Sequence, residues 1–230
     1  MAALLAVLGL AMLPARAEEP TEPSRLASIC PGVAAWRATH PEEQPAALLE
    51  RDRQRGLTDQ ALLDELQQRF EADQQARRRW LADRKNAELQ AAVVALDADN
   101  SAWLAQRLNG PGLPSVAEVG EQGQHLLWLL AQHADQQPRL QAALLAEFER
   151  RHARGEFATE DLARLTDRVL VHRGTRQRYG TQYDWGSPRY AQIDPSEFAP
   201  YAAARAEAGL MPLQDYACLM HAARKAPGTR

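Results

Sequence analysis

The sequence is poor in lysine and cysteine, and it has no excess of basic charge. Only Lys85 and Lys225 are lysines among 27 basic residues, so Schiff-base chemistry has almost no candidate nucleophile. The 27 basic and 30 acidic residues leave a formal net charge of −3, and we expect no nucleic-acid partner. With 45% apolar and 25% charged residues, the composition is that of a globular protein.

The two cysteines, Cys30 and Cys218, lie far apart in the sequence. They form no CxxC pair, which excludes the usual zinc and redox motifs. In an oxidising compartment they could join the N-terminal segment to the last helix, provided that their Cα atoms lie within roughly 7 Å. The alternative is two unpaired thiols, one in a flexible arm and one buried.

An apolar N-terminal run precedes a candidate signal-peptidase site. Residues 1–13 are nearly all apolar, and Ala15-Arg16-Ala17 has the small-x-small pattern, so we expect cleavage after Ala17 and a periplasmic or secreted protein. The run is shorter than the roughly 20 residues that span a bilayer, and no membrane anchor is expected after cleavage. No Lys or Arg precedes the run. A start codon placed too far downstream, or a non-exported protein with an apolar N-terminus, would explain that absence.

After the cleavage site, the sequence predicts a proline-containing arm or linker over 18–44 and one all-α domain over 45–230. Thr58 is the expected N-cap of one helix, Asn100-Ser101 of another, and the Gly/Pro-rich run 109–114 is expected to be a loop. Further helices are expected over 122–134, from Pro138 to Gly155, from Thr159 to Gly174, and over 200–209 and 212–223.

The residues after Gly174 differ from the rest of the chain. All five tyrosines lie beyond this point, and residues 176–185 alternate long polar and aromatic side chains. Such a segment is too aromatic to be disordered, so we expect an irregular loop or a short strand pair near 175–195.

Three short motifs follow one another in the chain: WLLAQHAD at 128–135, LTDRV at 165–169 and QRYGTQ at 177–182. Together they resemble a bacterial family of unknown function whose members carry W-L-L-x-Q-H-A-D, L-T-D-R-V and Q-x-Y-G-T-Q. The resemblance covers about Asp73 to Met220. The usual G-W-P element of the family is Gly112-Leu113-Pro114 here, which alters the loop. The resemblance implies no activity, so the chemistry has to be argued from the residues.

His133 is the candidate catalytic residue. Projected at 100° per residue, it falls inside the apolar arc of the helix over 122–134, where an imidazole serves as a metal ligand, a general base or a bonded core residue. An aspartate, Asp135 or Asp167, would orient the imidazole, and Arg168 would bind a polar or anionic ligand. Asp135 has an alternative role as the N-cap of the next helix, and Asp167 could instead pair with another arginine.

Gln177, Tyr179 and Gln182 are the second group of candidate ligand-binding residues. Amide and phenol groups in an irregular loop are suited to hydrogen bonding with a polar ligand. The alternative is a structural plug whose amides satisfy the ends of nearby helices.

Other kinds of site lack a supporting motif. His125 and His133 lie roughly 80° apart around one helix and two turns along it, too far apart for one ion. The sequence contains no HExxH, no G-x-S-x-G and no phosphate-binding glycine loop, so no metal or cofactor is expected. The run Arg77-Arg78-Arg79 is typical of a solvated helix face.

These observations predict an exported helical protein that binds a small polar or anionic ligand in a pocket lined by the motif residues, with His133 as general base. The alternative is a non-enzymatic interaction or structural protein. In that case the same residues form a buried polar network, and the Ala/Leu-rich N-terminal helices bind a partner protein. Convergence of the motif side chains on an open concavity would favour the first function, and a network sealed under the loop would favour the second.

Overall fold

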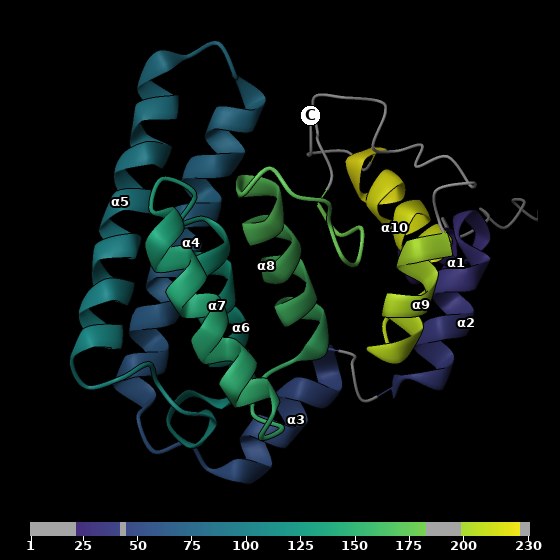
Figure 1. Ribbon diagram of the computed structural model, residues 1–230, viewed down its shortest axis with the longest axis horizontal. Coiled ribbons are helices and arrows are strands. Elements are labelled where there is room, and N and C mark those ends of the chain that lie inside the picture. The colour runs from purple at the N-terminus through teal and green to yellow at the C-terminus, as the bar shows by residue number, and fades with distance from the viewer. Residues whose placement is uncertain (1–21, 42–44, 183–198, 226–230) are drawn as a thin grey trace, which may run out of the picture.

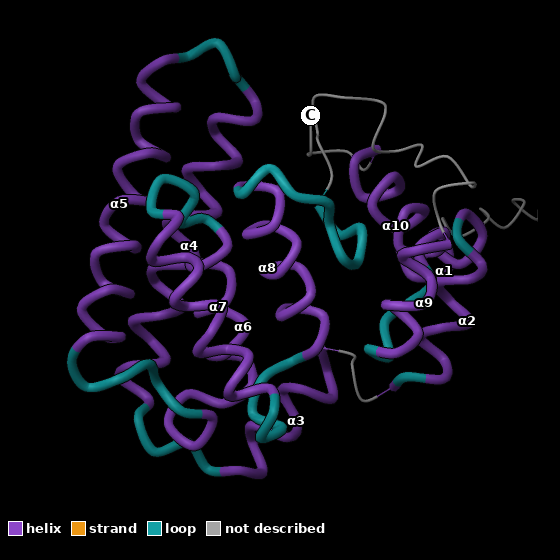
Figure 2. Tube along the Cα trace, in the orientation of Figure 1, coloured by secondary structure: helices purple, strands orange, loops and turns teal. Residues whose placement is uncertain are grey.

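The computed structural model describes residues 22–41, 45–182 and 199–225, which form helices and loops without a strand (Figure 1; Figure 2). The expected all-α fold class is therefore confirmed. In chain order the helices are α1 (Glu22–Ile29), α2 (Pro31–Thr39), α3 (Pro45–Arg55), α4 (Gln60–Ala82), α5 (Ala87–Asn109), α6 (Val116–Gln132), α7 (Pro138–His152), α8 (Thr159–His172), α9 (Ala199–Glu207) and α10 (Leu213–Lys225).

Helices α4 to α8 form the main bundle, in which α6 packs against both α4 and α8 (Figure 1). Each of the five contributes a side chain with 0% exposure to one shared apolar core: Leu66, Leu104, Leu127, Phe148 and Leu165. Burying a side chain of this size stabilises the fold by about 1.5–3 kcal/mol. The core therefore holds α6 in place within the bundle. The candidate site lies at the C-terminal end of this helix.

The helix starts differ in detail from the sequence prediction. Asp59, and not Thr58, is the N-cap of α4, because its carboxylate accepts a hydrogen bond from the Leu62 amide at 3.0 Å. Thr159 is the first residue of α8, and Ala158 precedes it as N-cap. The expectation that Asn100-Ser101 begins a helix is also wrong. Both residues are buried in the middle of α5, whose N-cap is Asn86.

Helix α6 is broken at Gly120 and anchored there by α3. Gly120 has φ 73° and ψ −179°, which interrupts the helix and exposes new amide groups. The carboxylate of Asp52 accepts hydrogen bonds from the amides of Glu121 at 2.8 Å and Gln122 at 2.9 Å. A Cβ at position 120 would lie 2.4 Å from the Asp52 carboxyl carbon, so this close approach requires glycine.

The expected arm over 18–44 contains two helices. Helices α1 and α2 pack against each other and against α10, and together with α9 they lie on one side of the main bundle (Figure 1). Pro31 is the first residue of α2, a position where proline is well tolerated, so it does not prevent this helix from forming. The proposed cleavage site and residues 1–17 lie outside the described residues.

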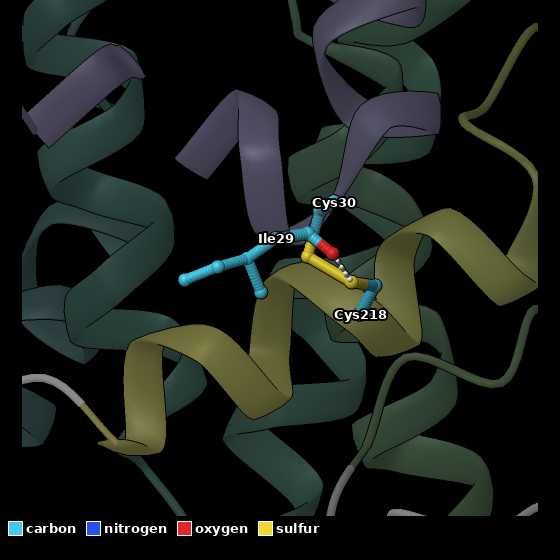
Figure 3. The surroundings of a disulfide bond; sticks show 3 residues. All are labelled: Ile29, Cys30 and Cys218. Carbon is cyan, nitrogen blue, oxygen red and sulfur yellow. Dashed lines mark hydrogen bonds between the residues drawn. A yellow bond between two sulfur atoms is a disulfide. The ribbon is translucent and has the colours of Figure 1, made fainter. Parts of the chain in front are cut away.

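A disulfide joins Cys30 to Cys218 and so ties the start of α2 to α10 (Figure 3). Their Cα atoms are 5.8 Å apart, and the bond closes a loop with a sequence separation of 188 residues. Restricting an unfolded chain over such a loop stabilises the folded state by about 5 kcal/mol in the chain-entropy model. Of the two alternatives that the sequence left open, the structure contains the disulfide.

Candidate functional site

His133 is the C-cap residue of α6, and its imidazole contacts an aspartate on α4. Nδ1 of His133 lies 3.0 Å from Oδ1 of Asp73, whose side chain is only 1% exposed, whereas the His133 side chain is 18% exposed. The other ring nitrogen, Nε2, has no hydrogen-bond partner among the described residues and is not one of their buried unpaired atoms. A buried carboxylate therefore fixes the ring of a partly exposed side chain, and Nε2 makes no hydrogen bond within the described residues.

Arg77 belongs to the same group, so the expectation that it lies on a solvated helix face is wrong. Its Nε donates to Asp73 Oδ1 at 3.1 Å and points at His133 Nδ1 at the same distance, and its Nη2 donates to Asp97 on α5. Arg78 and Arg79 are exposed, as expected for a solvated face. The difference arises because Arg77 lies one helical turn after Asp73, on the side of α4 that faces the bundle.

Asp73, Asp97 and His133 each offer a donor atom, and these atoms lie within 4.8 Å of one another, which is close enough to hold a cation. The guanidinium of Arg77 already bonds to both carboxylates. The group is therefore an Asp/His/Arg network whose positive charge comes from an arginine.

The two carboxyl groups of this network have pKa values shifted in opposite directions. Burial would raise the pKa of Asp73, but the His133 and Arg77 hydrogen bonds and charges outweigh burial and hold it below its usual value. Burial raises the pKa of Asp97 by more than Arg77 lowers it. Asp73 is therefore the ionised partner of His133 at neutral pH.

Asp135 and Arg168 form a second polar group next to the first. Arg168 Nε donates to Asp135 Oδ1 at 2.9 Å, and its Nη2 donates to Oδ2, so the contact is bidentate. His172 Nε2 lies 3.6 Å from the same carboxylate, and buried Gln141 also donates to it at 3.3 Å. Burial would raise the pKa of Asp135, but Arg168, His172 and Gln141 together outweigh it and lower the pKa. Asp135 is not a helix cap, because the N-cap of α7 is Gln137.

Asp167 is fully buried, with 0% exposure, and holds the loop that follows α8. Its Oδ1 accepts from the amides of Arg178 at 2.7 Å and Tyr179 at 3.0 Å. Its Oδ2 accepts from the amide of Thr181 at 2.8 Å and from the Thr181 hydroxyl at 2.9 Å. Both oxygens are thus occupied within the protein, so Asp167 positions this loop and does not line an open pocket.

The expected ligand-binding amides also bond within the loop. Gln177 Nε2 donates to the Gln182 carbonyl at 3.0 Å, and the Gln182 amide donates back to Gln177 Oε1 at 2.8 Å. The Gln182 side chain accepts from Arg168 and from Gln132 at 3.2 Å each. Gln182 therefore links the loop to the Asp135–Arg168 group and to Gln132, the last residue of α6.

The loop in turn holds helices α9 and α10. The Tyr179 carbonyl accepts from Arg205 Nη1 at 2.8 Å, and the Thr181 carbonyl accepts from the Tyr216 hydroxyl at 3.3 Å. Gly180, with φ 68°, allows the turn, and a Cβ there would lie 3.2 Å from the Leu213 side chain. In Figure 2 this loop runs from the end of α8 toward α9 and α10. Tyr179 thus acts through its backbone.

A separate aspartate–histidine pair joins α6 to α8. His125 Nδ1 is 2.7 Å from Asp161 Oδ2, and the imidazole stacks on Trp128 with ring centroids 5.0 Å apart. Burial lowers the pKa of His125, but Asp161 outweighs it, and the pKa lies above its usual value. The other charged groups that act on it are Arg164, which lowers the pKa, and Glu160, which raises it.

The structure brings His133, Asp135, Arg168 and Gln182 together at the end of α6, and it places Asp167, Gln177 and Tyr179 in the loop and its support. Sequence reasoning missed Asp73, Arg77 and Asp97. A signal for them was available, because all three continue apolar stripes at helical spacing. Asp73 and Arg77 follow Leu66 and Phe70 on α4, and Asp97 lies between Val93 and Leu104 on α5.

The model of a family of unknown function, DUF6624, matches residues 60–226. The chain belongs to this family. No curated protein and no solved structure matches the chain.

The DUF6624 match begins at the first residue of α4 and extends past the last residue of α10. It therefore includes both polar groups and the loop, whereas α1 to α3 precede it. None of the helices within the described residues is both long enough and apolar enough to cross a membrane.

The raised pKa of His125 predicts how stability depends on pH. Because the folded protein holds this proton more tightly than the unfolded chain, the pair stabilises the fold fully below pH 6.5, the ordinary histidine value, and less as the pH rises through the folded pKa. The NMR titration of the imidazole should give a midpoint above 6.5 that falls in Asp161→Asn. A wild-type midpoint at or below the ordinary value would contradict this assignment.

Proposed function

We propose that the domain binds a small polar ligand beside His133 and that Nε2 of His133 acts as a general base toward it. The proposal rests on one observation: a 1% exposed carboxylate contacts Nδ1, while Nε2 has no partner among the described residues. An imidazole fixed in this way holds Nε2 in one position, from which it can accept a proton from a bound hydroxyl, amide or water.

The charges around the site favour a neutral polar ligand over an anion. Arg77 and Arg168, the two arginines of the polar groups, already donate to carboxylates: Arg77 to Asp73 on its own helix and to Asp97 on α5, and Arg168 to Asp135. An anionic ligand would have to displace Asp73, Asp97 or Asp135 from these contacts, at the cost of leaving a partly buried carboxylate unpaired. A ligand with a dissociable proton and no formal negative charge avoids this cost.

The alternative, a structural or interaction protein, is favoured by a different observation. Asp167 is sealed, with four donors around its carboxylate, and Gln177 bonds within the loop. Part of the motif set is therefore a buried polar network that fixes the fold. The two functions differ at His133, because a purely structural network makes no use of its outward nitrogen.

Acylation by diethyl pyrocarbonate tests the proposed base directly. The reagent attacks a neutral, accessible imidazole nitrogen, so His133 in the folded protein should be modified at neutral pH. Asp73→Asn should slow the modification because it removes the carboxylate that polarises the ring. Peptide mass spectrometry quantifies each site, and His125, with a side chain 46% exposed, is the internal reference. Protection of His133 while His125 reacts would contradict the proposal.

Ligand screening on His133→Ala separates the two functions. The substitution removes a partner of the buried Asp73 carboxylate, so it should lower the free energy of unfolding by about 1–3 kcal/mol under either function. A thermal-shift panel of neutral polar metabolites should then contain compounds that stabilise the wild type but not this variant.

We also propose that the chain is exported and that residues 1–17 are removed. The small-x-small pattern ending at Ala17 and the Cys30–Cys218 disulfide support this, since such bonds persist in oxidising compartments.

Export predicts two properties of the protein isolated without reductant. Its N-terminal residue should be Glu18, and neither cysteine should react with iodoacetamide until the protein is reduced. N-terminal sequencing and mass spectrometry measure both. An intact Met1 together with two alkylated cysteines would overturn the export proposal.

A further inference from the structure

We infer that Asp97 is a positioning residue for His133: by holding Arg77, it keeps the imidazole proton on Nδ1 and leaves Nε2 as the base. The inference rests on the proposed function and extends it to a residue that does not itself contact His133 through a hydrogen bond. It concerns the Asp/His/Arg network on α4, α5 and the end of α6.

Two neighbours, Asp73 and Arg77, compete for a hydrogen bond with Nδ1 of His133. Nδ1 lies 3.0 Å from the acceptor Asp73 Oδ1 and 3.1 Å from the donor Arg77 Nε. If Nδ1 carries the proton, it donates to Asp73 and Nε2 is a base. If Nδ1 lacks the proton, it accepts from Arg77, and Nε2 carries a hydrogen and can only donate.

Counting hydrogens favours the first arrangement. Arg77 Nε has one hydrogen, and it already faces Asp73 Oδ1 at 3.1 Å and Oδ2 at 3.3 Å. Without a proton on Nδ1, that one hydrogen would serve three acceptors, and Nδ1 would face Oδ1 at 3.0 Å as one lone pair against another. Asp73 Oδ2 also accepts from Gln74 Nε2 at 2.9 Å, so with a proton on Nδ1 the buried carboxylate gains a third donor and this repulsion disappears.

Asp97 controls how Arg77 is placed in this competition. Arg77 Nη2 donates to Asp97, whose side chain is 15% exposed, so the planar guanidinium is held at both ends by carboxylates on two different helices. Released from Asp97, the guanidinium can turn and donate two hydrogens to Asp73, as arginine prefers to do with a carboxylate. That movement would displace the Nδ1 proton from Asp73 and favour the Nε2–H tautomer.

A matched control lies two residues further along the same helix. Asp99 on α5 also accepts from an arginine, Arg69, at 2.8 Å, and its side chain is 69% exposed. Asp99→Asn removes the same charge from the same helix without touching Arg77 or His133. A comparison with Asp97→Asn therefore separates positioning from a general change in charge.

The test is the tautomer of His133, measured by long-range ¹H–¹⁵N correlation spectra of the imidazole above its pKa, together with its rate of diethyl pyrocarbonate modification. The wild type and Asp99→Asn should show a protonated Nδ1. Asp97→Asn should shift the ¹⁵N pattern toward a protonated Nε2 and slow the modification by about threefold or more. Arg77→Lys, which keeps the charge but cannot bridge both aspartates, should act in the same direction and serves if Asp97→Asn does not fold.

The outcomes distinguish the inference from the proposed function. If Asp97→Asn leaves both the ¹⁵N pattern and the modification rate of His133 at wild-type values, the role of Asp97 is refuted while the general base stands. If the wild type itself carries its proton on Nε2, both fail. If Asp99→Asn changes the ¹⁵N pattern and the modification rate as much as Asp97→Asn does, the loss of a negative charge explains the effect. That result would also refute the inference.

Discussion

The carboxylate of Asp167 is the interaction on which the arrangement of the described residues depends. It has 0% exposure and accepts three backbone amides and one hydroxyl from residues 178–181. Four donors compensate the cost of burying a charge and fix the path of the loop. The loop carbonyls then hold Arg205 and Tyr216, so one side chain on α8 positions the last two helices against the bundle.

The candidate site also depends on this loop, through its residue Gln182. Gln182, the last described residue of the loop, bonds to Arg168 and to Gln132, next to His133. Asp52 on α3 fixes the start of the second half of α6, so His133 lies at the end of a helix held at both ends. A rigid helix end is what a general base needs, because its nitrogen must stay in one place as the ligand binds.

The helices of the main bundle were predictable because their apolar periodicity is strong. The errors were in caps such as Asp59 and Asn86, at Asn100-Ser101, which lies inside α5, and in the arm, where α1 and α2 were not expected. The pairing of Asp135 with Arg168 was not predicted, since motif neighbours reveal shared importance but not contacts. Asp73 and Asp97 were missed for another reason. Each continues an apolar stripe at helical spacing, Asp73 after Leu66 and Phe70 and Asp97 after Val93. The periodicity of a single helix does not show that the two stripes meet.

Hydrogen exchange of the loop amides tests most directly whether Asp167 carries the loop. In the wild type, the amides of Arg178, Tyr179 and Thr181 should be protected to a degree comparable with α8. Asp167→Asn retains one acceptor oxygen and brings an NH₂ group toward the same donors. Protection of these three amides should therefore fall sharply while the amides of α5 stay protected. Equal protection in the wild type and the variant would contradict the account, as would rapid exchange of these amides in the wild type.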